Sequence, residues 1–176
     1  MNFSLSEAAE VLERTPGTLE RLLSGLSAGW LESNEGEDTW NAREVVNHLI
    51  EAEKTNWLPR LNCILAEGVK KAFPPFDRFS HLRNRDEREM KQILDEFTLI
   101  RQQNIQTLLD LERQGLDLEK TGIHPEFGTV KARELLSAWV VHDLTHISQI
   151  VRIMAERYRE NTGPWVKYLS ILRRKS

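Results

Sequence analysis

Two of the five histidines in this 176-residue chain stand four residues apart in Val141-His142-Asp143-Leu144-Thr145-His146-Ile147-Ser148-Gln149-Ile150. The apolar residues around them recur at helical spacing, which predicts an amphipathic helix. Residues at i and i+4 lie one above the other on the same helix face, so two imidazoles can converge on one small ion. Imidazole is a ligand for zinc, nickel, copper and iron. Ordinary polar residues on a helix face are the alternative explanation of this pair.

A third histidine occurs in a matching segment earlier in the chain. The sequence Asn41-Ala-Arg-Glu-Val-Val is nearly repeated as Lys131-Ala-Arg-Glu-Leu-Leu. With these two segments aligned, His48 falls one turn before His142 and two turns before His146. All three histidines therefore belong to the same relative helix face, and they would point into one gap if the two helices pack side by side. A partly buried histidine with an ordinary polar partner is the alternative for His48.

Composition places the chain among globular proteins. Hydrophobic residues make up 40% and charged residues 29% of the sequence. The net charge is −3, and acidic and basic residues are mixed along the chain. This pattern gives no indication of a nucleic-acid partner. The single cysteine, Cys63, cannot form an intrachain disulfide, and we expect it to be a small buried hydrophobe. No signal peptide or membrane span is visible, so we expect one cytoplasmic domain over residues 1–176 without a membrane partner.

Four long helices are predicted, and no stretch alternates convincingly at a period of two. Their expected bounds are about 6–26, 41–67, 84–115 and 131–159, followed by a short last helix over 165–174. Pro16-Gly17 predicts a kink or break in the first helix, and Pro59 predicts a bend in the second. Long connections over 68–83 and 114–129 are the kind that often shape a site. The expected fold class is all-α, a four-helix bundle with a short extra C-terminal helix and no sheet of three or more strands.

Two segments resemble the DinB-like superfamily. They are Trp40-x-x-x-Glu44-Val45-Val46-x-His48-Leu49 and Gly128-Thr-Val-Lys-Ala-Arg-Glu-Leu-Leu-x-x-Trp139-x-x-His142-Asp143-x-x-His146-x-x-Gln149-Ile150, and Gly163-Pro164-Trp165 is also similar. The resemblance implies a DinB-like four-helix bundle, often dimeric, that binds a divalent metal, commonly nickel or zinc. The metal ligands that it implies are His48, His142 and His146. Where the family favours Ser or Thr as the helix cap, this chain has Lys131, so Thr129 is expected to cap instead.

A site with three protein ligands indicates chemistry or ligand capture, because structural zinc sites normally have four. A bound metal could lower the pKa of water toward about 7 for hydrolysis, or ionise a small thiol. The proteins that the chain resembles include metal-dependent hydrolases and thiol S-transferases that use low-molecular-weight thiols. We therefore expect an enzyme of one of these two kinds, acting on a small-molecule substrate. The alternatives are a non-catalytic metal or small-ligand binding protein of the same fold, and a helical interaction module with incidental histidines.

Two carboxylates are the weak candidates for a catalytic role, Glu51 and Asp143. Asp143 follows His142 as the glutamate follows the first histidine of His-Glu-x-x-His peptidases. It should point about 100° away from its neighbour, so a buried hydrogen-bonding role is favoured for it. Glu51 is equally compatible with a role beside the metal and with a solvated helix surface.

Other residues receive lesser roles. Asp77 is expected to form a turn or to rim the pocket, and His81 and His124 are expected to lie exposed in loops. Trp139 is a candidate wall of the metal pocket. Large apolar residues, together with the resemblance, predict a homodimer; those singled out as contacts are Trp30, Trp57 and Trp165.

Overall fold

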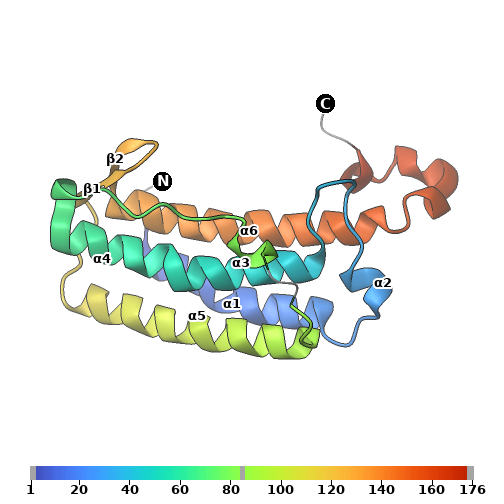
Figure 1. The fold of residues 1–176 in the computed structure, drawn as a ribbon, viewed down its shortest axis with the longest axis horizontal. Helices are drawn as coiled ribbons and strands as arrows, with labels where there is room; N and C mark the ends of the chain where they lie inside the picture. The colour runs from blue at the N-terminus through green and yellow to red at the C-terminus, as the bar shows by residue number, and fades with distance from the viewer. Residues whose placement is uncertain (1–2, 84–85, 174–176) are drawn as a thin grey trace.

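Four long helical segments lie side by side along the length of the molecule (Figure 1). The computed structural model describes residues 3–83 and 86–173. The long helices are α1 (Leu5–Leu23), α3 (Ala42–Thr55) continued by α4 (Trp57–Glu67), α5 (Met90–Arg113) and α6 (Ala132–Glu156). Between them lie α2 (Ala28–Leu31), η1 (Gly68–Lys70), η2 (Ser80–Leu82) and a hairpin of β1 (Thr121–His124) and β2 (Gly128–Lys131). The chain continues past α6 through η3 (Glu160–Lys167) and η4 (Ser170–Leu172). The prediction of a mainly helical bundle is confirmed.

Helix α1 runs through Pro16 without the predicted break. Proline lacks the amide that would bond to the carbonyl four residues earlier, here that of Leu12. The guanidinium of Arg101 on α5 supplies the missing donor, with Nη1 2.8 Å from the Leu12 oxygen. A side chain from the neighbouring helix thus satisfies the carbonyl that proline leaves free. Of the predicted kink or break, the break was wrong.

The second predicted helix is divided at Asn56 into α3 and α4. The pyrrolidine ring of Pro59 clashes with the carbonyl four residues earlier, that of Thr55, so the irregular backbone lies one turn before the proline itself. The predicted capping box is confirmed at the start of α3. Asn41 Oδ1 accepts from the Glu44 amide at 3.0 Å, and Glu44 Oε2 accepts from the Asn41 amide at 2.9 Å.

Helix α5 begins at Met90, later than predicted, because Glu89 and Gln92 form its capping box. The expected cap, Asn84, lies outside the described residues. The predicted stop at Gly115 is confirmed. This glycine has a φ of 86°, and the next amide donates to the Leu111 carbonyl at 3.1 Å, as in a Schellman motif.

The hairpin was missed at the sequence level. Its strands are only four residues each, paired from Thr121 with Lys131 to His124 with Gly128, and they show no hydrophobic alternation. Thr129 therefore lies in β2 and does not cap α6, contrary to prediction. Lys131 is the cap residue, and Glu134 Oε2 accepts from its amide at 2.9 Å. The region after α6 is 3₁₀-helical, with Gly163 at a φ of 51°, where one short helix over 165–174 was expected.

The apolar core lies between the four long segments, and Trp57 belongs to it. This indole is 6% exposed and is stacked on Trp139 with ring centroids 5.8 Å apart. Trp57 therefore cannot be the partner-chain contact that the sequence suggested, whereas Trp165 is exposed. The homodimer itself stays a prediction. Within the described ranges, no helix is both long and apolar enough to cross a bilayer.

Candidate metal centre

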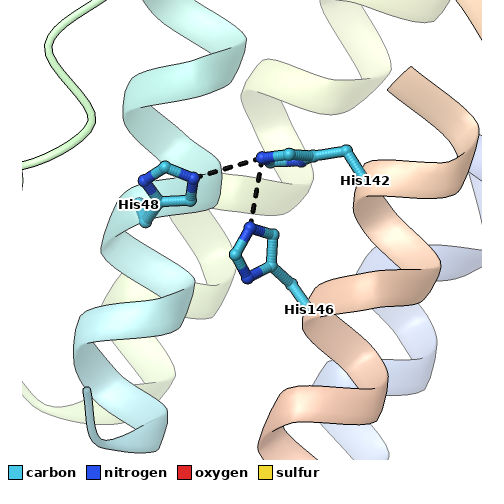
Figure 2. Close-up of side chains that lie close together, drawn as sticks. All are labelled: His48, His142 and His146. Atoms are coloured by element: carbon cyan, nitrogen blue, oxygen red, sulfur yellow. Dashed lines mark hydrogen bonds between the residues drawn. The ribbon is translucent and has the colours of Figure 1, made fainter. Parts of the chain in front are cut away.

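Three imidazoles from two neighbouring helices meet between α3 and α6 (Figure 2). His48 comes from α3, and His142 and His146 come from consecutive turns of α6. The Nε2 atom of His142 lies 3.1 Å from Nε2 of His48 and 3.1 Å from Nε2 of His146. The three ligand nitrogens all lie within 4.8 Å of one another. The sequence therefore predicted correctly which histidines come together.

The chemistry of this donor set fits a metal ion. Two nitrogens bound to one ion at about 2.0–2.1 Å lie roughly 2.9–3.4 Å apart at octahedral to tetrahedral angles, and both short separations fall in that range. Hydrogen bonds alone do not explain both contacts of His142. A neutral imidazole nitrogen carries either one proton or one lone pair, so it makes one well-directed hydrogen bond, and any second contact has to share that proton or lone pair. A shared cation would satisfy all three lone pairs at once.

The site keeps its histidines neutral, which is the form that binds metal. Burial, with a smaller contribution from the charge of His146, lowers the pKa of His48 to about 3 and that of His142 to about 2. Burial also lowers the pKa of His146, against the opposing effects of Gln149 and Asp143. Protons therefore compete weakly for these three nitrogens near pH 7.

Gln149 orients one of the ligands. Its Oε1 lies 2.8 Å from Nδ1 of His146, so Nδ1 carries the proton and donates to it. The lone pair of His146 is then on Nε2, which faces the other two histidines. Gln149 is part of the sequence motif, but its role could be assigned only once the ring orientation was known. Among the described residues, the Nδ1 atom of His142 is buried without a hydrogen-bond partner.

An aromatic wall encloses one side of the triad. The indole of Trp40 is 4.8 Å from the ring of His48 and is stacked at 6.3 Å on that of His146. The expectation that His81 is merely exposed was wrong, because η2 places its ring 4.5 Å from Trp40 and 5.3 Å from His48. Both ring nitrogens of His81 are buried with no hydrogen-bond partner in the part of the chain that the structure describes, and burial lowers its pKa to about 4.

A cavity of about 720 Å³ opens beside the triad. Helix α6 contributes the three-turn stripe Glu134, Ala138, His142 and His146, which repeats every four residues. The 71–79 connection lines it as predicted, with Phe73, Pro75, Phe76 and Arg78, and the other linings come from α3, α4 and the hairpin. Trp57 and Trp40 line the cavity. Trp139, the predicted wall, does not line it; it is stacked on Trp57 and donates from Nε1 to Glu53.

The two weak catalytic candidates are not beside the triad. Asp143 is fully buried and makes a bidentate ion pair with Arg101 at 2.6 and 3.0 Å, in the hydrogen-bonding role favoured for it. Glu51 does not line the cavity; its Oε2 is 3.5 Å from Ser80 Oγ on η2. Neither carboxylate is placed to receive a proton from a group held at the three histidines.

Arg101 is the centre of a buried polar network that sequence reasoning missed. Besides Asp143 it binds Glu53 at 2.8 Å, and Asn104 donates to the same carboxylate at 2.9 Å. Burial alone would lower the pKa of Arg101, but the charges of Asp143 and Glu53 raise it. The sequence does contain a signal that Arg101 is buried. This residue stands four positions after Phe97 and four before Ile105, within the apolar stripe of the helix.

The remaining candidates have structural contacts. Asp77 forms a turn, its Oδ1 accepting from the Phe79 amide at 3.0 Å, and it pairs with Arg83. Cys63 is half-buried against the core. His124 is also half-buried, in the hairpin, where it stacks on Phe127 at 4.4 Å.

Comparison with known proteins agrees with this geometry. The model of the DinB superfamily matches residues 11–150, which include all three histidines. The chain belongs to the DinB superfamily. No curated protein matches it. This DinB-superfamily chain shares its fold with YfiT from Bacillus subtilis, a structure described as a probable metal-dependent hydrolase with an unusual four-helix bundle topology. The TM-score is 0.72 at 19% identity, and the match covers 92% of this chain and 91% of that one.

Proposed function

We propose that this protein is a metal-dependent hydrolase of a small molecule, with a divalent ion, nickel or zinc, held by His48, His142 and His146. The observation that carries the proposal is the set of three Nε2 atoms facing one another beside a cavity of about 720 Å³. Three protein ligands leave coordination positions for water and substrate. The description of YfiT as a probable metal-dependent hydrolase supports the same function.

When bound, the ion would supply Lewis-acid chemistry, lowering the pKa of a coordinated water toward about 7 or ionising a coordinated thiol. The chain's own residues prepare the site for it. Gln149 fixes the proton of His146 on the nitrogen that faces away from the triad. Trp40 and Trp57 cover the rings of His48 and His142, at 4.8 and 5.1 Å. Aromatic residues, among them Phe73 and Phe76, form much of the cavity wall, and an apolar wall strengthens the electrostatic interactions of a bound group.

A thiol S-transferase is the second candidate, and one observation favours it. Among the described residues, no carboxylate is placed as a proton acceptor at the triad, because Asp143 is paired with Arg101 and Glu51 lies outside the cavity. Water activation commonly uses such a base, whereas a thiol loses its proton on coordination alone. Hydrolysis remains first because three histidines suffice for it in known zinc enzymes.

The test uses purified protein loaded with nickel or with zinc and a matched His142→Ala variant. Metal content is measured by mass spectrometry, and turnover is measured on a panel of esters, amides and lactones. A second panel pairs electrophiles with low-molecular-weight thiols. Hydrolysis that depends on metal and is lost in His142→Ala supports the proposal. Turnover only with thiols selects the second candidate. One equivalent of bound metal with no turnover in either panel selects the non-catalytic alternative and refutes both.

A further inference from the structure

Arg60 is a buried cation that has no acidic partner within residues 3–83 and 86–173. It lies on α4, is 8% exposed and lines the cavity beside the triad. Its polar contacts are Nε2 of His124 at 3.2 Å and the Pro74 carbonyl at 3.5 Å. Burial lowers its pKa, and no carboxylate of the described residues lies near enough to oppose that effect. A desolvated and unpaired charge destabilises a fold, so it calls for a role beyond packing.

The contact with His124 is between two donors. Nδ1 of His124 accepts from the amides of Glu126 and Phe127, at 3.1 and 3.3 Å, and therefore carries no proton. In the neutral imidazole the proton is then on Nε2. That N–H faces the guanidinium of Arg60. Among the described residues, no acceptor receives a hydrogen bond from both of these donors. An oxyanion beside the pair would accept from Nε2 and from the guanidinium together.

This pair lies at the hairpin end of the cavity. The α6 stripe that lines the cavity runs from Glu134 to His146, which is about 18 Å at 1.5 Å per residue. The acidic side chains at that end do not neutralise Arg60: Glu134 Oε2 accepts from the Lys131 amide, and Glu126 is exposed on the hairpin turn. The walls between the two ends are largely aromatic, among them Trp57, Phe73 and Phe76.

We propose that Arg60 and His124 form an oxyanion subsite for a carboxylate or phosphate group of the substrate. The guanidinium provides a planar fork that matches either group. The substrate class is then an elongated small molecule, with an anionic end at Arg60, an apolar body along the aromatic walls and its reactive group at the three histidines. The assignment of the reactive end rests on the proposed function; the anion subsite itself does not.

The experiment measures binding to metal-free protein by calorimetry at pH 7.5. The probes are 4-phenylbutyrate, its uncharged amide and 4-phenylbutylphosphonate. The wild type should prefer the acid over the amide by at least about tenfold, as expected for charge-assisted hydrogen bonds. Arg60→Gln should abolish that preference, and Arg60→Lys should reduce it because the fork is lost. His124→Asn keeps an acceptor for the turn amides but places no donor where the Nε2–H of His124 lies, so it should weaken binding of the acid several-fold.

Arg14→Gln is the control, because Arg14 is an exposed cation of α1 far from the cavity lining, and it should leave the preference unchanged. Tighter binding of the phosphonate than of the acid assigns the subsite to phosphate, and the reverse assigns it to carboxylate. Equal affinity of acid and amide for the wild type, or a preference that survives Arg60→Gln, would overturn the inference. The metal content of the same variants is measured separately. If the wild type binds a full equivalent of metal but does not prefer the acid over the amide, only the subsite is refuted. If it prefers the acid but binds no metal, only the proposed function is refuted.

Discussion

Replacement of His142 by alanine is the most direct perturbation of the candidate metal centre. His142 is the ligand whose Nε2 lies 3.1 Å from both of the other histidines, so its removal eliminates both short nitrogen–nitrogen contacts. His48 and His146 stay on their helices but lose the ligand between them. Two imidazoles from separate helices then hold the ion, and we expect the metal affinity to fall sharply.

The magnitude follows from the contribution of one ligand. Structural zinc sites bind with about 10–16 kcal/mol over four ligands, so one ligand accounts for roughly 3–4 kcal/mol, or two to three orders of magnitude in Kd. The effect on the metal-free fold should be smaller. The imidazole is half-buried and packs against Trp57 at 5.1 Å, but its Nδ1 has no hydrogen-bond partner among the residues that the structure describes. Its removal should cost the metal-free protein about 1–2 kcal/mol.

Competition with a chromophoric chelator gives the Kd, and thermal unfolding with and without metal gives the stability. Metal at 100 times its Kd should stabilise the wild type by about 2.7 kcal/mol, a gain that the variant should lack. His124→Ala is the matched control, since that ring bonds to hairpin amides away from the triad. His81→Ala is not suitable, because the ring lies 5.3 Å from His48. A His142→Ala protein with one equivalent of metal at unchanged affinity would refute this site assignment.

Gln149→Leu should weaken metal binding about 10–100-fold, because nothing would then hold the proton of His146 on Nδ1; a competition titration checks this. Asp143→Ala should cost about 3–5 kcal/mol in urea unfolding because it leaves Arg101 buried with one carboxylate fewer; a loss below 1 kcal/mol would argue against the network. Burial lowers the pKa of His48 to about 3, so the metal-free fold should lose stability as pH falls from 6.5 toward 3, where the unfolded chain takes up protons that the native state excludes. Denaturant midpoints that are flat across that range would contradict this. Light scattering at micromolar concentration should give twice the mass of one chain; a monomer mass would end the homodimer prediction.

The triad could be predicted because helix geometry fixes the face on which each histidine lies, and the family resemblance implies that the two helices are neighbours. The spacing of His142 and His146 fixes their common face, and the near-repeat around His48 gives the same face on a second helix. The cap at Asn41 and the stop at Gly115 were also local signals, which a neighbouring helix does not override. At Pro16 the local rule failed because of a tertiary contact. Pro16 remains inside α1 because Arg101 bonds to the carbonyl that it leaves free.

The rest of the site required contacts between distant segments. Nothing near His81 in the sequence indicates that a 3₁₀ turn brings it against His48 and Trp40. Arg60 and His124 are 64 residues apart, and only the packing of the hairpin on α4 joins them. Such pairs carry no periodic signal because each residue alone is compatible with an exposed surface.

The buried network and the metal centre are connected through the rotation of α6 about its axis. Asp143 follows His142 directly, so its side chain points about 100° around the helix from that ligand. Anchoring Asp143 to Arg101 therefore turns both histidines of α6 toward α3. At a side-chain radius of about 5–6 Å, a helix rotation of roughly 10° would move the imidazoles by about 1 Å. That displacement is a large fraction of the 3.1 Å separation between the ligand nitrogens. We therefore expect the carboxylate that resembles a peptidase base in the sequence to fix the rotation of α6, and with it the direction of His142 and His146, through its ion pair with Arg101.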